Sequence, residues 1–258
     1  MYFYASFMEF LFESILLVVV GFFAGIINTL AGGGSLFTLP VLIFLGLPPT
    51  LANGTNRIAI VVQSLGGALG YSSKGVHTFP FPIYLGISAS VGALIGAQIA
   101  LEVEGALFNR ILAVIMLVVG LLILIRRKAL ALNLPERLDG IYLVYSILGF
   151  FFIGVYGGFI NAGIGIVIML FLNRINFLSL VKTNATKVWV VLIYSAVALG
   201  TFAFNDAVNW QLGSLMALGT LFGAWWASRW SVKKGDRVIR LAMLFTLFVM
   251  AIKLWFFE

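Results

Sequence analysis

The segment NTLAGGGSLFTLP (28–40) interrupts an apolar run with three consecutive glycines. Each glycine weakens a helix by about 1 kcal/mol relative to alanine, so a helix that continues through residues 32–34 is unfavourable. The break frees backbone amides, which in hydrocarbon need partners from the protein, from water or from a ligand. A helix that begins near Ser35 would point its N–H groups and its positive dipole end into the break, which makes an anion site. Close helix packing on small residues is the alternative explanation.

A second glycine cluster, NAGIGI (161–166), repeats this pattern further along the chain. At an offset of 131 residues AGGG (31–34) aligns with AGIG (162–165), and NGT (53–55) aligns with NAT (184–186) without a gap. Two matches at one offset indicate an internal repeat. We therefore divide a single integral membrane domain into a first membrane repeat, 1–128, and a second membrane repeat, 129–258.

The composition places the chain in a membrane. Of its 258 residues 62% are hydrophobic and 10% are charged, and the mean hydropathy is +1.12. A soluble domain carries about 25% charged residues, so a water-soluble globule is excluded, and so is a disordered chain. The absence of cysteine and the single histidine, His77, exclude thiolate and multi-histidine metal sites. No cofactor is expected, and the net charge of +7 points to the lipid surface rather than to nucleic acid.

Apolar runs define the expected spans. The long ones are 14–31, 56–72, 79–100, 106–125, 139–160, 186–204, 209–228 and 238–256. Two shorter runs, 36–46 and 166–173, each follow a glycine cluster. A straight helix needs about 20 residues to cross a bilayer, so each short run is half of a broken helix or of a re-entrant hairpin. Each repeat is therefore expected to hold a broken or re-entrant helical hairpin followed by three transmembrane helices.

Loop charges fix the relative orientation of the halves. Loops 126–139 and 229–240 are rich in Lys and Arg, whereas 101–105 and 205–208 carry acidic residues and no cation. The positive-inside rule places the basic loops in the cytoplasm, which requires that 139–173 cross the membrane twice or not at all. The fold class is then an all-α polytopic membrane protein with two inverted-topology repeats. We expect it in the cytoplasmic membrane of the cell with both termini outside.

Two cations lie close to the glycine breaks. Arg57 and Lys187 each fall near the start of a long apolar run, where a bare charge is costly and suggests function. Snorkelling to lipid headgroups is the alternative for the cations, and helix capping is the alternative for the neighbouring Asn and Thr residues. With no carboxylate nearby in sequence, we expect a bound anion to neutralise both cations. The remaining predicted substrate-binding residues are Asn28, Thr29, Gly32, Gly33, Gly34, Ser35, Asn53, Thr55, Asn56, Asn161, Gly163, Gly165, Asn184 and Thr186.

Nothing in the sequence indicates an enzyme. There is no Walker loop, and no histidine or buried carboxylate stands near a serine in the spans. No Asp or Glu lies deep in an apolar run, which argues against a carboxylate proton relay. Symport of a proton with an acidic substrate, or electrogenic efflux, remains open.

The stretch GFFAGIINTLAGGGSLFTLPVLIFLGLPPTLANGTNR (21–57), with a weaker copy at 154–187, resembles the sulfite exporter TauE/SafE family of bacterial membrane permeases. The second copy departs from the pattern at NAGIG and TNATK. The resemblance implies a secondary transporter of a small anion such as sulfite or a sulfonate, and its partners are that anion and the lipid bilayer. A passive anion channel, and a membrane subunit that delivers substrate to a partner enzyme, are the alternative functions. The oligomeric state is not predicted.

Overall fold

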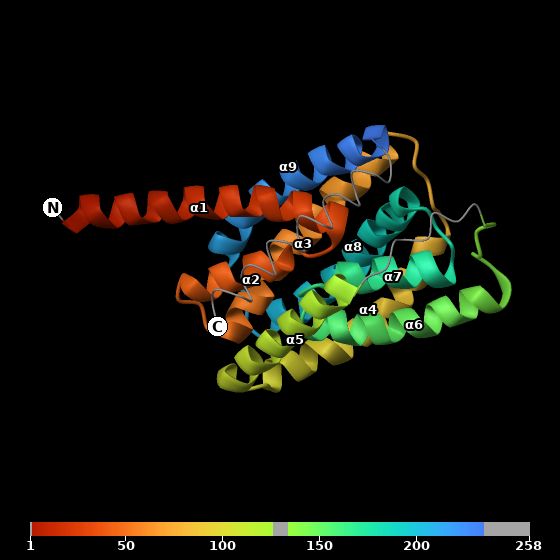
Figure 1. Cartoon of the computed structure of the whole chain (residues 1–258). Coiled ribbons are helices and arrows are strands. Elements are labelled where there is room, and N and C mark those ends of the chain that lie inside the picture. Colours follow the sequence, from red (N-terminus) through yellow and green to blue (C-terminus); the bar gives the residue numbers. More distant parts are fainter. Residues whose placement is uncertain (1, 126–133, 235–258) are drawn as a thin grey trace.

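The computed structural model describes residues 2–125 and 134–234, and these two ranges are helical with short connections (Figure 1). The helices of the first half are α1 (Tyr2–Ala31), α2 (Ser35–Phe44), α3 (Pro49–Ser72), α4 (Phe81–Glu102) and α5 (Gly105–Ile125). Those of the second half are α6 (Gly140–Phe159), α7 (Ile164–Ile175), α8 (Leu180–Phe204) and α9 (Trp210–Lys234). The expected span 238–256 and the basic stretch 126–133 lie outside the described residues.

The all-helical fold class is confirmed for this part of the chain. Four helices are long and apolar enough to cross a membrane: Leu11–Ala31, Phe81–Glu102, Gly140–Phe159 and Leu180–Phe204. Two helix starts were predicted too late, because α3 begins at Pro49 and α8 at Leu180 rather than near 56 and 186. The first turns of these helices are polar, and a hydropathy criterion misses polar helical turns.

This shift overturns the capping explanation of the two N-x-T elements. They lie inside α3 and α8 instead of at their ends. The N-cap of α8 is Ser179, whose side chain accepts from the Lys182 N–H at 3.3 Å, and Pro48 stands at the N-cap of α3. The polar side chains of both elements are therefore available for contacts with other helices.

Each half contains the predicted broken hairpin. Helices α2 and α7 have 10 and 12 residues, and at about 1.5 Å per residue each spans roughly half of a bilayer core. The chain reverses at Gly32 and Gly163, which adopt left-handed φ values of +83° and +72° at equivalent positions of the repeat. Such φ values are easy for glycine and strained for other residues. Figure 1 shows the α1–α2 and α6–α7 hairpins entering the molecule from opposite ends.

The two halves are interleaved. Helix α1 packs on α9 of the second half, and α4 packs on α6. In both interfaces paired glycines face the backbone of the partner helix, namely Gly21 and Gly25, Gly219 and Gly223, Gly92 and Gly96, and Gly154 and Gly158. A Cβ at any of these positions would overlap a backbone carbonyl of the partner, so the close approach depends on glycine.

One pair of equivalent helices, α3 and α8, shows its relative direction through its contacts. Helices α3 and α8 are antiparallel, since Gly67 near the end of α3 contacts Val188 near the start of α8, whereas Gly54 contacts Phe202. Helix α9 instead runs parallel to α3, with Gly213 against Ile58. The boundary between the two repeats at 128/129 stays a prediction. Helices from both sides of it pack together as one body.

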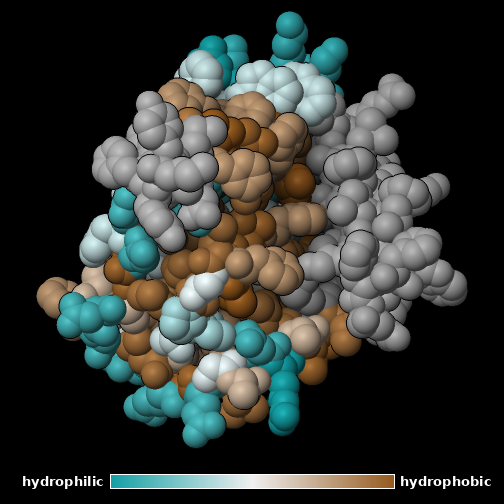
Figure 2. Space-filling model, turned by 90° about the vertical axis from the view of Figure 1, so that its left-hand side faces the viewer, coloured by the Kyte–Doolittle hydropathy of each residue, from teal (hydrophilic) through white to brown (hydrophobic). Residues whose placement is uncertain are grey.

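The surface of the described part is largely apolar. Figure 2 shows one end of the molecule with a broad hydrophobic area and hydrophilic residues toward its margins. Large side chains such as Phe44, Phe152 and Phe204 are 86%, 69% and 93% exposed. Exposed apolar surface of this extent suits lipid rather than water.

Charged residues separate between the two ends. Val76, Val181 and Val232 pack in one cluster, which places the ends of α3 and α9 beside the start of α8. This end carries seven described cations, Lys74, Arg137, Arg174, Lys182, Arg229, Lys233 and Lys234, and two carboxylates, Glu136 and Asp139, so the separation is one of net charge. The opposite end carries Glu102, Glu104 and Asp206, with Arg110 as a lone cation among the described residues there.

Candidate functional site

The two glycine breaks cross each other. The backbone of Gly32 lies against the backbone of Gly165, and a Cβ on either residue would overlap the other. The chain segments that follow α1 and α6 therefore meet inside the protein, as the repeat predicts. The predicted site residues gather around this crossing in two related networks.

Lys187 binds the end of α1. Its Nζ donates to the carbonyls of Asn28 at 2.9 Å and Thr29 at 3.0 Å, and to Oδ1 of Asn184 at 2.7 Å. The Asn184 amide in turn donates to the Leu30 carbonyl at 3.1 Å. Lys187 is 3% exposed and lies about two turns inside α8, so the snorkelling explanation is wrong for this residue.

Arg57 binds the end of α6 in the same manner. Its guanidinium donates to the carbonyls of Gly157 and Gly158, the second at 2.8 Å, and lies 3.4 Å from Oδ1 of Asn53. The Asn53 amide donates to the Phe159 carbonyl at 2.8 Å. Arg57 is fully buried, so snorkelling is wrong here too.

Each half thus caps the broken helix of the other half. The last carbonyls of a helix have no partner within the helix and carry the negative end of its dipole, so a cation there is stabilising. The carbonyls thus lower the cost of burying the two cations. Carbonyls are neutral, however, so each site keeps its formal positive charge. The ion pair between Lys182 and Glu136 lies away from both buried cations, at the basic end of the described part of the chain.

A small polar cavity lies beside the crossing. Its lining consists of Asn28, Gln63, Ser64, Asn161, Ile164, Gly165, Lys187, Val188 and Val191. Its volume of about 10 Å³ has room for roughly one water molecule. The cavity brings together residues from both breaks and from both capping helices, and Lys187 supplies its positive charge.

Hydrogen bonds hold the side chains around this cavity. Tyr194 donates from its hydroxyl to Oδ1 of Asn161 at 2.6 Å, and the Asn161 amide donates to Oγ of Ser35 at 3.3 Å. The Gly34 N–H donates to Oδ1 of Asn28 at 3.3 Å. The orientation of Asn28 and Asn161 is therefore set before any ligand arrives.

Several buried polar atoms near the crossing have no hydrogen-bond partner within the described residues: Oγ1 of Thr29, Oδ1 of Asn56, Nε of Arg57, Oγ of Ser64, Oγ1 of Thr186 and Oγ of Ser195. Each unpaired buried group costs about 1–3 kcal/mol, and such groups in a native protein call for an explanation. Ser64 lines the cavity, so a ligand there could satisfy its hydroxyl.

The structure divides the sixteen predicted residues. Asn28, Asn161, Gly165 and Lys187 line the cavity. The other predicted residues do not line it and are Thr29, Gly32, Gly33, Gly34, Ser35, Asn53, Thr55, Asn56, Arg57, Gly163, Asn184 and Thr186. Among these, Thr55 accepts from the Asn209 N–H at 2.9 Å and so holds the loop before α9.

Two cavity residues, Gln63 and Ser64, are absent from the predicted set. They follow Asn56 by seven and eight residues, which places them on the same face of α3 two turns further along. At the 131-residue offset they align with Tyr194 and Ser195. Polar residues at equivalent positions of both halves were the signal that could have identified them.

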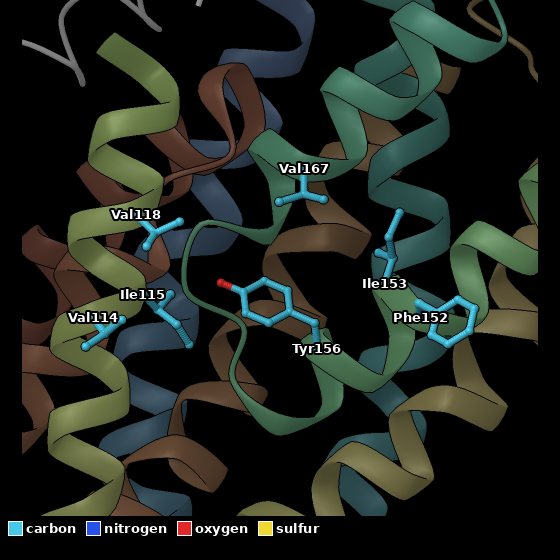
Figure 3. A pocket seen from close by; sticks show the side chains of 7 residues that line it. All are labelled: Val114, Ile115, Val118, Phe152, Ile153, Tyr156 and Val167. Atoms are coloured by element: carbon cyan, nitrogen blue, oxygen red, sulfur yellow. The ribbon is translucent and has the colours of Figure 1, made fainter. Parts of the chain in front are cut away.

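A larger cavity of about 390 Å³ lies between α5, α6 and α7 and is apolar (Figure 3). Its lining is Val114, Ile115, Val118, Phe152, Ile153, Tyr156 and Val167. The hydroxyl of Tyr156 donates to the Ala162 carbonyl in the second break and is the polar group of this lining. A cavity without charge does not suit a small anion, so the polar cavity is the better candidate.

Comparison with known proteins agrees with the geometry. The chain is 27% identical over 238 residues to a probable membrane transporter protein ORF9 from a Sinorhizobium species, covering 92% of this chain and 90% of that protein. It is 27% identical over 239 residues to a probable membrane transporter protein of Haemophilus influenzae, covering 93% of each. A third relative, the probable membrane transporter protein YfcA of Escherichia coli K12, is 26% identical over 92% of this chain and 88% of that protein.

No solved structure matches the chain. The profile of the family described as Sulfite exporter TauE/SafE matches residues 17–254. The helical fold, the crossed glycine breaks and this match across most of the chain agree, and the protein belongs to the sulfite exporter TauE/SafE family of membrane transporters.

Proposed function

We propose that this transporter is a secondary carrier of a small sulfur-containing or organic anion, which binds between the glycine breaks of two inverted repeats. The observation that carries the proposal is the buried Lys187 ammonium in the wall of the polar cavity. Its carbonyl partners lower the cost of burial and are neutral, and the ammonium carries a formal positive charge. An anion in the cavity would neutralise that charge.

The chemistry of the cavity suits an oxyanion. Lys187 offers a charged donor, Asn28 and Asn161 offer side-chain amides, and Ser64 offers an unpaired hydroxyl. Sulfite and sulfonates present several acceptor oxygens on one centre, which such converging donors can bind together. The family description names sulfite, whereas the relatives are named only as probable membrane transporters.

The antiparallel course of α3 and α8 supports the inverted repeat. In transporters built from inverted repeats the substrate lies near the midplane at the repeat interface, and one repeat moves against the other to alternate access. The cavity has room for about one water molecule, so binding of the anion requires that the breaks move apart, as movement of one repeat against the other would allow. A passive channel would instead need a continuous water path.

We propose further that the basic end faces the cytoplasm of a cell membrane and that the N-terminus lies outside. The chain has no cysteine, so single cysteines can report orientation directly. With Lys182→Cys at the basic end and Asp206→Cys at the other, an impermeant thiol reagent applied to whole cells should label only the second variant. If the reagent labelled only Lys182→Cys, the proposed orientation would be wrong and the basic end would lie outside.

The test of the proposal is anion uptake into proteoliposomes, after a thermal-shift screen against sulfite, thiosulfate, sulfonates and small carboxylates. Lys187→Gln should reduce uptake at least 30-fold, which corresponds to about 2 kcal/mol for a lost charged contact. Lys182→Gln is the matched control, because Lys182 lies on the same helix at the surface, and it should transport normally. Normal uptake by folded Lys187→Gln would exclude the cavity as the substrate site.

A further inference from the structure

A second charged cavity lies at the basic end, between the ends of α3 and α9 and away from the glycine breaks. Its lining is Lys74, Trp225, Trp226, Arg229, Trp230, Val232 and Lys233, and its volume is about 440 Å³. Helices α3 and α9 end together here, since Ser231 donates to the hydroxyl of Tyr71 at 3.1 Å. Three cations and three indole rings therefore surround one opening.

The cations of this cavity are not paired with carboxylates in the described part of the chain. No acidic residue is among the lining residues, and Lys74, Arg229 and Lys233 take no part in the ion pair between Lys182 and Glu136. The Cζ atom of Arg229 lies 4.6 Å from the centroid of the Trp225 ring, so a cation–π contact holds the guanidinium beside this indole. A fixed guanidinium can bind two oxygens of a phosphate at once.

The tryptophans point to a ligand at the membrane interface. Trp226 and Trp230 stack with ring centroids 5.3 Å apart and planes within 15°. Both rings are also well exposed, at 47% and 37%. Indole rings gather at the level of the lipid headgroups, where one side of the ring is apolar and its N–H is wet.

An apolar stripe continues from the cavity along α9. Leu218 and Phe222 precede Trp225 by seven and three residues, which places the three on one helix face, and they are 52% and 61% exposed. Gly219 and Gly223, which approach α1, each follow a residue of this stripe by one position, or about 100° around the helix, so the stripe lies beside the α1 interface and outside it. An acyl chain that extends from the cavity toward the middle of the membrane would lie along this stripe.

From the charge, the aromatic rim and the adjoining stripe, we propose that this cavity binds the phosphate of an anionic phospholipid. The phosphate contacts Lys74, Arg229 and Lys233, the tryptophans border the headgroup, and one acyl chain follows Leu218 and Phe222. A free phosphate would use the same cations but gain nothing from the stripe. This site is independent of the anion carried through the glycine breaks.

The experiment measures lipid binding to the purified full-length protein. Native mass spectrometry reports the bound lipid, and thermal unfolding reports the stabilisation. Phosphatidylglycerol should bind at least tenfold more tightly than phosphatidylcholine with the same acyl chains. Arg229→Gln should weaken phosphatidylglycerol binding about fivefold, and removal of all three cations about 100-fold. Arg229→Lys, which keeps the charge, should retain most of the preference.

Arg174→Gln is the matched control, since Arg174 is an exposed cation at the same end on α7. It should leave the preference for phosphatidylglycerol unchanged, and an equal loss in this variant would reduce the effect to net charge and overturn the proposal. Glycerol phosphate and inorganic phosphate form a further arm. Stabilisation by either one equal to that by the lipid would identify a free phosphate as the ligand and overturn the proposal. If Arg229→Gln fails to fold, the exposed Lys233→Gln variant replaces it, with the same expected fivefold change.

Discussion

The two glycine breaks occupy equivalent positions, yet their capping cations differ in chemistry and in access. Arg57 uses two nitrogens for the carbonyls of Gly157 and Gly158 and does not line the polar cavity. Lys187 binds the carbonyls of Asn28 and Thr29 and also forms part of the cavity wall. The difference teaches that a repeated structural role can be kept in both halves while only one copy also lines a cavity.

The largest effect is expected where the two breaks touch. Gly32→Ala places a Cβ against the Gly165 backbone and strains a residue with φ of +83°, so it should cost about 3–5 kcal/mol. Gly46 has φ of +88° and open space around it, so Gly46→Ala should cost about 1–2 kcal/mol of backbone strain. Thermal unfolding of both variants in one detergent measures the difference. Equal losses would contradict the close crossing of the breaks.

The second effect concerns the cap on α6. Arg57→Gln leaves buried carbonyls without a charged donor and should lower the free energy of unfolding by about 3 kcal/mol. The free energy of unfolding of Arg57→Lys should lie between those of the wild type and Arg57→Gln, because one ammonium does not reproduce the planar guanidinium fork. Melting temperature and anion uptake are measured on the same preparations. A variant with wild-type stability and no transport would make Arg57 a substrate ligand rather than a cap.

A smaller effect should separate two equivalent serines. Ser64 lines the polar cavity and Ser195 does not, although both hydroxyls are buried without a partner in the described residues. Ser64→Ala should raise the KM for the anion about fivefold, since one hydrogen bond is worth about 1 kcal/mol. Ser195→Ala should stay within about twofold of the wild type. Transport titrations in proteoliposomes distinguish them, and a reversed order would move the substrate toward α8.

The smallest effect should separate Thr55 from Thr186, its equivalent in the second half. Thr55 accepts from the Asn209 N–H, whereas the Thr186 hydroxyl has no partner in the described part. Thr55→Val should lower the free energy of unfolding by about 1 kcal/mol, and Thr186→Val should be neutral or slightly stabilising. Thermal unfolding tests both. Destabilisation by Thr186→Val alone would reveal a contact with a ligand or with residues outside the described ranges.

The sequence was sufficient for the all-helical fold and for the two short helices, because membrane helices obey simple limits of length and polarity. Glycine clusters at one offset predicted the breaks at Gly32 and Gly163, and the short runs after them predicted α2 and α7. The starts of α3 and α8 were missed, since polar turns that face a protein interior look like loops in a hydropathy profile.

The partners of Arg57 and Lys187 could not be predicted from the sequence. A sequence shows which side chains are charged, but it does not show which carbonyls lie opposite them in the folded protein. The cations were expected to need an anion, and the ends of α1 and α6 supply part of the compensation instead. Gln63 is polar within an apolar run and near the site elements in sequence, but it was left out of the predicted set, because only the packing of α3 against the breaks places it at the cavity.

The reciprocal caps also bear on how such a protein can originate. A single half would bury the end of its own interrupted helix without the cation that completes it, because that cation belongs to the other half. A second copy of the same half could supply the missing cation. An ancestor of half this length would therefore have needed such a pairing to complete its interrupted helix.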